Sequence, residues 1–429
     1  MKYKAKVVIS LGMLCIAPFA FAETTAIQCG KLFDSASAKM LGAKTIVVEG
    51  NKISQILDGA STVANAKIIN LSSQTCSPGF IDLHVHLRGE SNPQSYSEGF
   101  RLNPEFTVLR SVGYSKKTLM AGFTSVRDLG GETTFALRDG INQGLVDGPR
   151  IWAAGKSIAT TGGHGDPTNG LSHELEEAIG TPGPEDGVIN SPEEARAAVR
   201  QRYKDGSDVI KITATGGVLS YAKNGDGPQF TVAEVKAVVD TAKDYGYTVA
   251  AHAHGKEGIK RAVLGGVTSI EHGTYMDDEI FRLMKQNGTW YVPTISAGKF
   301  VAEKAKVDGF YPEVVRPKAA RIGAQIQTTF SNAYKAGVPI AFGTDAGVSY
   351  HGDNAREFGF MVEAGMPVNA ALQAATYNAA KVLGSSEVGQ IKQGYFADIV
   401  AMPQDPNQDI NTTEKVSFVM KNGVVYKQP

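Results

Sequence analysis

Two histidines stand one residue apart in an alternating segment near the start of the chain. Residues 78–87 read PGFIDLHVHL. Side chains in a strand alternate between its faces, so His84 and His86 share one face and Asp82 lies one step behind them. As plain core residues, two histidines would each need a buried hydrogen-bond partner. Two imidazoles side by side at a strand end can instead hold one metal ion, which is the interpretation we favour.

Four more side chains able to bind a metal ion lie in strand-like segments further along the chain. They are Lys211 in 209–213, His252 in 248–252, His272 in 268–272 and Asp345 in 340–345. A lysine inside an apolar run is costly to bury, although Lys211 alone could also extend its ammonium group out to solvent. If the strands run parallel, all these residues meet at one end of them, and together they predict a site for two metal ions.

The metal-type residues belong to a series of eight strand-like stretches separated by helix-like ones. The stretches are 78–87, 123–128, 151–154, 209–213, 248–252, 268–272, 290–294 and 340–345. Between them, residues 191–204 open with Ser-Pro-Glu-Glu and residues 231–245 with Thr-x-x-Glu, both good helix starts. This repeat predicts an α/β fold with a (β/α)8 TIM-like barrel. An open doubly wound sheet is the alternative, but it would need a glycine-rich phosphate turn that the chain lacks.

Short strands and turns occupy both ends of the chain. Residues 46–53 indicate a hairpin around Gly50-Asn51, and residues 416–420 and 424–426 indicate strands joined by a two-residue turn. We therefore expect both ends to form one small β-sandwich domain into which the barrel is inserted. The expected boundaries are a signal peptide in 1–22, the two parts of the β domain in 23–75 and 385–429, and the barrel in 76–384.

The first 22 residues have the pattern of a secretory signal. Lys2, Lys4 and Lys6 precede the apolar run 7–21, which ends in Ala-Phe-Ala, a small-x-small cleavage pattern. The run is short for a membrane span, and no later stretch is long and apolar enough to cross a bilayer. We expect an exported bacterial protein, periplasmic or secreted, that is mature from about residue 23.

The net charge argues against a nucleic-acid-binding protein, and the cysteines argue against a thiol enzyme. Without the first 22 residues the chain has a net charge of −3, and it has no basic tract of the kind that binds nucleic acid. Cys29 and Cys76 then remain, and the sequence leaves open whether they form a disulfide in an oxidising compartment. No histidine flanks either cysteine, which argues against a catalytic thiol. Homo-oligomer formation is also left open.

The spacing of these residues resembles that of a known family. The motifs are PGxxDxHxH at 78–86, the lysine at 211, TGGHGD at 161–166, TGGV at 215–218, EHG at 271–273 and GTDA at 343–346. Together they are similar to the amidohydrolase superfamily with two metals, over essentially the whole mature chain. More narrowly they resemble its Xaa-Pro-dipeptidase-like and carboxypeptidase-like branch, whose members include hydrolases of N-acyl amino acids and of ochratoxin.

The resemblance implies roles for the six metal-type residues. His84 and His86 would hold one divalent ion with Asp345, and His252 and His272 the second, while carboxylated Lys211 would bridge the two. Burial lowers the pKa of a lysine, so that its neutral amine can react with CO2. Zinc suits these ligands, although manganese or cobalt could serve. A hydroxide bridging the metals would attack an amide carbonyl, and Asp345 would pass its proton to the leaving amine.

Three further residues are implied as contacts of the substrate. His164 would polarise the carbonyl, His254 would bind the carboxylate of a C-terminal residue, and Tyr221 would line the pocket. The substrate would then be a dipeptide or an N-acyl amino acid, cleaved to release the C-terminal residue. Asp82, Arg127, Asp128 and Thr344 are expected to support the ligands from behind, unless they are ordinary structural pairs.

Two other functions stay open at this point. A ring-opening amidase or deaminase of the same superfamily would usually hold one metal and lack the strand-borne lysine, so Lys211 argues against it. A barrel without catalytic activity would be expected to have lost metal ligands, and this chain retains all six. Neither a nucleophile elbow nor a helical zinc-protease motif occurs in the sequence.

Overall fold

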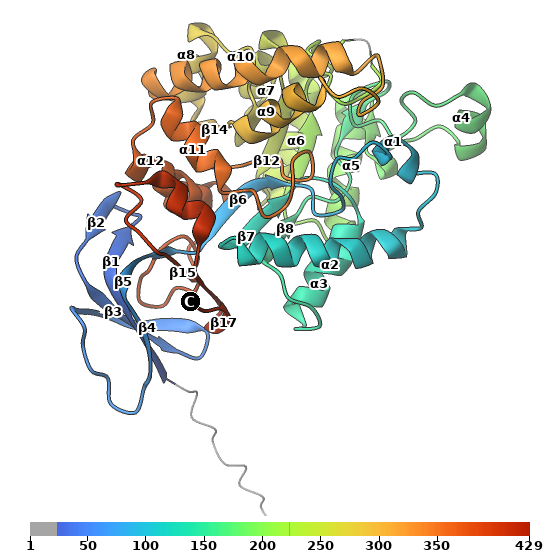
Figure 1. Cartoon of the computed structure of the whole chain (residues 1–429). Coiled ribbons are helices and arrows are strands. Elements are labelled where there is room, and N and C mark those ends of the chain that lie inside the picture. Colours follow the sequence, from blue (N-terminus) through green and yellow to red (C-terminus); the bar gives the residue numbers. More distant parts are fainter. Residues whose placement is uncertain (1–23, 223) are drawn as a thin grey trace, which may run out of the picture.

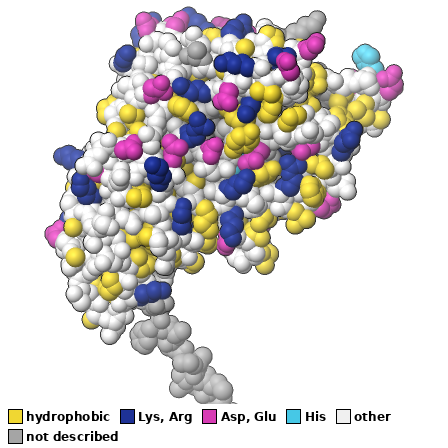
Figure 2. Space-filling model, in the orientation of Figure 1, with side chains coloured by type: hydrophobic (Ala, Val, Ile, Leu, Met, Phe, Trp, Pro, Cys, Tyr) yellow, Lys and Arg dark blue, Asp and Glu magenta, His cyan; other side chains and the backbone are white. Residues whose placement is uncertain are grey.

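The computed structural model describes residues 24–222 and 224–429, so the predicted signal segment lies outside the described residues. A sheet built from both ends of the chain lies beside a larger region of parallel strands and helices (Figure 1). The described residues contain no helix whose length and apolar character would let it span a bilayer. Charged side chains of both signs are interspersed over the face seen in Figure 2.

The first sheet has eight strands, with the order β17-β16-β15-β5-β1-β3-β4 and β2 paired to β1. Their bounds are β1 Thr24–Asp34, β2 Lys39–Leu41, β3 Lys44–Glu49, β4 Lys52–Asp58, β5 Lys67–Pro78, β15 Ile399–Met402, β16 Phe418–Lys421 and β17 Val424–Lys427. The predicted hairpin is confirmed, since Glu49 of β3 pairs with Lys52 of β4. The turn between β16 and β17 is confirmed too, and its two residues, Asn422 and Gly423, both have positive φ.

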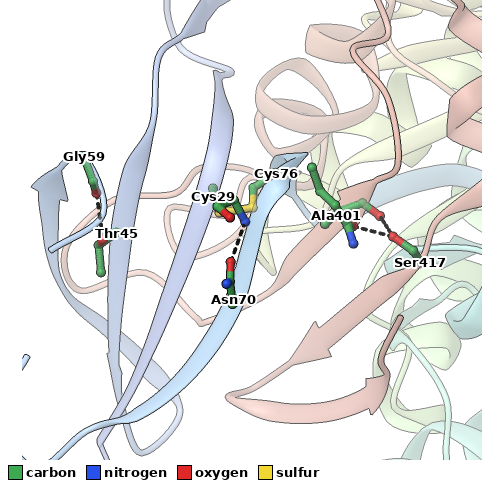
Figure 3. Close-up of a disulfide and its surroundings, with 9 residues drawn as sticks. Cys29, Thr45, Gly59, Asn70, Cys76, Ala401 and Ser417 are labelled. Atoms are coloured by element: carbon green, nitrogen blue, oxygen red, sulfur yellow. Dashed lines mark hydrogen bonds between the residues drawn. A yellow bond between two sulfur atoms is a disulfide. The ribbon is translucent and has the colours of Figure 1, made fainter. Parts of the chain in front are cut away.

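The central strands of this sheet are joined covalently. Cys29 of β1 and Cys76 of β5 form a disulfide, with their Cα atoms 5.9 Å apart (Figure 3). A bulge between Cys29 and Lys31 interrupts the parallel pairing of the two strands. Gly30 sits in this bulge, where a Cβ atom would lie 2.2 Å from the carbonyl oxygen of Ser72. The close approach of the two backbones therefore requires glycine.

The second region contains two parallel sheets. One holds β6 Phe80–Val85, β7 Phe123–Asp128 and β8 Arg150–Ala153, and the other holds β11 Ile210–Thr213, β12 Val249–Ala253, β13 Ser269–His272 and β14 Trp290–Val292. Hydrogen bonds join the sheets at both edges. The amide of Asp208 donates to the carbonyl of Ala153 beside β8. At the other edge, residues 340–346 lie between β14 and β6, since Tyr291 bridges Ile340 and Val85 bridges Ala346.

Helices follow the parallel strands along the chain (Figure 1). They are α1 Ser95–Glu98, α2 Pro104–Met120, α3 Thr133–Asn142, α4 His173–Ile179, α5 Pro192–Asp205, α6 Val232–Asp244, α7 Lys256–Gly265, α8 Asp278–Asn287, α9 Ile295–Lys304, α10 Arg316–Lys335, α11 Arg356–Glu363, α12 Val368–Gln373 and α13 Ala379–Leu383. The short elements are β9 Ala159–Thr160, β10 Val188–Ile189, η1 Pro184–Asp186, η2 Ala374–Asn378 and η3 Ile410–Lys415. Both predicted helix starts are confirmed, because Ser191 caps α5 and Thr231 forms a capping box with Glu234 in α6.

The chain therefore has an α/β fold in which each parallel strand segment is hydrogen-bonded to the next. The largest apolar cluster packs strand residues such as Ile210 and Ile270 against helix residues such as Val238 and Ile259. Each of the eight predicted strand segments has a hydrogen-bonded neighbour on both sides, and the eighth, residues 340–346, is bonded through bridges. The C-terminal ends of these segments carry the residues singled out from the sequence.

Candidate active site

A cavity of about 720 Å³ opens where the parallel strands end. Its lining includes every histidine, lysine and aspartate for which the sequence predicted a metal-binding, catalytic or substrate-binding role. These are His84, His86, His164, Lys211, His252, His254, His272 and Asp345. The convergence follows from parallel strands, whose C-terminal ends meet at one face of the sheet.

The hydrogen bond of His84 fixes which ring nitrogen faces the cavity. Its Nδ1 lies 2.9 Å from a carboxylate oxygen of Glu271, and since a carboxylate only accepts, Nδ1 must donate. Burial lowers the pKa of His84 well below its usual value, so Nε2 of the neutral ring carries a lone pair. That lone pair is 3.4 Å from Oδ1 of Asp345. Two electron-rich atoms that face each other in a buried site are stabilised by a nearby cation, which can be the ammonium group of Lys211, 3.4 Å from Nε2 of His84, or a bound metal ion.

The same argument applies to His252. Its Nε2 donates to the carbonyl oxygen of Gly216 at 3.1 Å, which leaves Nδ1 as the free nitrogen. The ring of His272 lies 4.7 Å from that of His252 and 4.9 Å from that of His84, between centroids. Nδ1 of His272 is 2.8 Å from the hydroxyl of Thr294. Each of these three rings is therefore held by one nitrogen and has the other available for a ligand bond.

Asp345 and Lys211 complete the cluster. Oδ1 of Asp345 is 3.2 Å from Nε2 of His86 and has no hydrogen-bond partner among the described residues. Nζ of Lys211 lies 3.4 Å from Nε2 of His84. One ligand atom each from His84, His272 and Asp345 falls within 4.8 Å of the others, a spacing that one metal ion could fill. The cluster is compatible with metal binding.

The pKa values of the buried Lys211 and Asp345 are shifted in directions that suit metal binding. Burial lowers the pKa of Lys211 to about 8, which leaves a fraction of neutral amine at neutral pH. Burial alone would raise the pKa of Asp345, but the nearby His84, His86 and Lys211 outweigh it and the pKa falls. Asp345 is therefore ionised at neutral pH and able to accept a proton or ligate a cation.

Backbone strain also concentrates here. Six residues other than glycine have positive φ among the described residues, and three of them are His272 (71°), Thr294 (52°) and Asp345 (58°). A left-handed conformation is costly for a β-branched residue such as Thr294. Strain of this kind persists where the surrounding structure holds it in place, and the hydroxyl of the strained Thr294 contacts Nδ1 of His272.

Two of the residues predicted to support the metal-type side chains from behind, Asp82 and Asp128, make such hydrogen bonds in the structure. The carboxylate of Asp82 accepts from the hydroxyl of Thr344 at 2.6 Å and from the side chain of Asn354 at 2.8 Å. It thereby ties residues 340–346 to β6. Asp128 accepts from the amides of Leu87 and Gly130, so it shapes the turn that follows His86.

Arg127 has a partner that the sequence did not predict. Its guanidinium donates to Glu271 at 2.8 Å, and Glu271 in turn accepts from His84. The sequence assigned no role to Glu271, to Thr294 or to the carbonyl of Gly216. A charged residue in a buried strand was the available signal for Glu271, since such a group needs a partner.

Two of the three residues predicted to contact the substrate line the cavity, and the third does not. His164 and His254 line the cavity, with their rings 4.4 and 4.7 Å from that of His252. Burial and neighbouring charge lower the pKa of His164 to about 4 and of His254 to about 3. Both rings are neutral at pH 7, so a cationic His254, which would have suited a carboxylate, is not supported. Tyr221 is half exposed, packs against Tyr96 and is absent from the residues that line the cavity.

Comparison with known proteins identifies the family. The family model described as the amidohydrolase family matches residues 75–426. The chain belongs to the amidohydrolase family. The ochratoxinase of Aspergillus niger is 34% identical over 368 residues, which span 82% of this chain and 75% of the relative. The family resemblance drawn from the motifs is thus confirmed, and the chain is a hydrolase of this family.

Solved structures of this family superpose over nearly the whole chain. A Xaa-Pro dipeptidase with methionine bound in its active site has 51% identity and a TM-score of 0.91, covering 94% of this chain and 100% of the other. A prolidase complexed with N-methylphosphonate-L-proline has 30% identity and a TM-score of 0.84, covering 95% and 100%. The fold of this chain is the one these hydrolases share.

Proposed function

We propose that this chain is a metal-dependent hydrolase that cleaves the amide bond of a dipeptide or an N-acyl amino acid and releases the C-terminal residue. The observation that carries the proposal is the convergence of Nε2 of His84 and Nε2 of His86 on Oδ1 of Asp345, a buried oxygen that has no hydrogen-bond partner among the described residues. The similarity to a dipeptidase and to ochratoxinase supports an amide substrate with a free amino-acid product.

Two divalent ions fit the donors present. His84, His86 and Asp345 would hold one, His252 and His272 the second, and carboxylated Lys211 both, with zinc favoured by the nitrogen-rich ligand set. Bound there, the ions would supply an activated water and polarise the carbonyl of the substrate. Glu271 and Thr294 fix the ring orientations of His84 and His272 before any metal binds.

The protein side chains handle the protons and the substrate. Asp345 is ionised and its Oδ1 is unpaired, so it can take a proton and deliver it to the leaving amine. His164 is neutral and can donate a hydrogen bond to the carbonyl oxygen as negative charge develops there. His254 is held through Nδ1 by Thr274 at 2.8 Å, which leaves Nε2 free to bond the carboxylate of the substrate.

The strand pairing and the disulfide support the domain architecture and the cellular location that we propose for the protein. The continuous hydrogen bonding of eight parallel segments supports a (β/α)8 barrel in 76–384, and the sheet of both chain ends supports a small β domain from 23–75 and 385–429. The Cys29–Cys76 disulfide supports an oxidising compartment, consistent with export through residues 1–22 to the periplasm or outside the cell. Homo-oligomer formation stays open.

A substrate screen tests the proposal. The mature protein, loaded with zinc, is incubated with a library of dipeptides and N-acyl amino acids, and released amino acids are quantified. We expect release of the C-terminal residue, abolished in Asp345→Asn and retained in Asp353→Asn, a matched change of a half-exposed loop aspartate. Hydrolysis of cyclic ureides or imides instead, with no amino acid released from the library, would overturn the proposal in favour of a ring-opening enzyme.

A further inference from the structure

Part of the cavity lining is apolar and continuous. Its members come from the loop after β11 and from helices α9 and α10, and four of them, Val218, Leu219, Val301 and Ile322, pack in one cluster. The wall, as we call it here, consists of Val218, Leu219, Ala297, Val301, Ile322 and Ile326. No residue of the wall carries a charge or a side-chain hydrogen-bonding group.

The charged residues at the cavity mouth lie in other loops. Lys156 is 3.2 Å from Asp186 and 3.5 Å from Glu132, so these three charges largely satisfy one another. Arg88, Glu132 and Lys156 lie in the loops after β6, β7 and β8, Asp186 ends η1, and all four line the cavity. The cavity therefore has a charged region and an apolar region, and a substrate must place a different chemical group against each.

The apolar wall is rigid before any ligand binds. A Cβ atom on Gly298 of α9 would lie 2.7 Å from the side chain of Ile326, and one on Gly323 of α10 would lie 2.5 Å from that of Ala302. The two helices are thus in close contact through these glycines. Little conformational entropy is lost when a ligand meets a wall that is already formed.

The loop that carries Val218 and Leu219 is held by Tyr96, whose hydroxyl donates to the carbonyl of Leu219 at 2.8 Å, and by a lysine. The ammonium group of Lys318 in α10 donates to the carbonyls of Ser220 at 2.6 Å and of Ala222 at 2.7 Å. A third carbonyl, that of Gly217, lies 3.4 Å away. Lys318 is buried and its charge is directed at the loop backbone, so it holds the wall in place.

We infer that this wall is the subsite for an uncharged aliphatic or aromatic group that flanks the scissile amide, and that it sets the substrate preference of the enzyme. The inference deepens the proposed function and rests on it. A charged side chain placed there would lose its hydration without gaining a partner. Each methylene buried against such a wall discriminates by about tenfold or more between substrates.

Two matched substrate series test the inference. The first keeps an N-acetyl group and varies the C-terminal residue among glycine, leucine, phenylalanine, lysine and glutamate, and the second keeps C-terminal glycine and lengthens the acyl chain. We expect kcat/KM to rise about tenfold or more with apolar size in one series, which identifies the end that meets the wall. A preference for lysine or glutamate would overturn the inference, whereas no hydrolysis in either series would overturn the proposed function instead.

Variants of the wall supply the control. Ile322→Ala should reduce the preference for the large apolar substrate over its glycine counterpart by about tenfold, and Leu219→Glu, on a partly exposed loop, should raise the relative rate with lysine. Leu264→Glu, on the exposed face of α7, should change neither. Thermal melts check folding, and calorimetry compares binding of free leucine and free lysine without turnover. Unchanged preferences in both folded wall variants would contradict the inference.

Discussion

Nδ1 of His84 donates a hydrogen bond to the carboxylate of Glu271, 2.9 Å away, although 187 positions separate the two residues in sequence. Glu271 also accepts from Arg127 and from the hydroxyl of Ser269, all inside the fold with no exposed surface on the carboxylate. One carboxylate thus fixes the tautomer of His84, a proposed metal ligand on β6, and neutralises a guanidinium on β7. The orientation of this proposed ligand therefore depends on a residue that does not line the cavity.

Glu271→Gln removes the charge of this carboxylate and keeps its shape. We expect metal affinity to fall by about 10–100-fold, the usual effect of losing such a partner. Stability should also fall by about 3–5 kcal/mol, because Arg127 is left as an unpaired buried charge. Competition with a chelator measures the metal affinity, and urea-induced unfolding measures the stability. Glu279→Gln, at an exposed pair with Lys256 and Lys260, is the control and should alter neither.

Lys211 should react with CO2 with a characteristic pH dependence. The neutral amine is the reactive form, and with a pKa of about 8 roughly one lysine in ten is neutral at pH 7. At a fixed concentration of dissolved CO2, the rate of carboxylation of metal-free protein should therefore rise about tenfold per pH unit up to about 8 and then level. The ¹³C signal of a carbamate formed from labelled bicarbonate measures it. A rate that keeps rising to pH 10, or a signal that persists in Lys211→Ala, would refute this assignment.

His164 is expected to act on the transition state. His164→Ala should lower kcat by about 10²–10³-fold, with a smaller effect on KM, because the hydrogen bond to the carbonyl oxygen strengthens as charge develops. Since burial lowers its pKa to about 4, the ring is neutral from pH 6 upward. Its removal should leave the pH profile of kcat unchanged in shape over this range. An effect confined to KM would make His164 a binding residue only.

The disulfide should contribute to stability and not to catalysis. Cys29 and Cys76 are 47 positions apart, and closing a loop of that size stabilises the fold by about 4 kcal/mol in the chain-entropy model. The double variant Cys29→Ser/Cys76→Ser should unfold at lower urea concentration but keep its kcat/KM, because neither residue lines the cavity. Adding a reductant should lower the urea concentration at which the parent protein unfolds by the same amount, and it should not change that of the double variant.

The sequence predicted the parts of this site that follow from strand geometry. Alternation placed His84 and His86 on one face, and parallel strands brought Lys211, His252, His272 and Asp345 to the same end. These are local rules, so they need no knowledge of which strand lies beside which. The disulfide was left open because pairing depends on β1 and β5 being neighbours, which spacing alone does not reveal.

The parts that the sequence did not predict depend on contacts between distant elements. Thr294 takes a left-handed backbone conformation after β14 and contacts His272 from there. The prediction for Tyr221 was made from its place in the loop after β11, yet that loop is pulled toward α10 by Lys318 and the ring faces Tyr96. Loop direction of this kind is set by tertiary contacts rather than by local pattern.

The most direct test of the account is the metal content of the purified protein. Elemental analysis of the mature chain, after growth with zinc and removal of loose metal, should give two divalent ions per chain. Lys211→Ala should hold fewer, since the bridging ligand is lost, and chelation should abolish hydrolysis of the amide substrate. A parent protein that hydrolyses the amide at full rate with no bound metal would contradict the central claim.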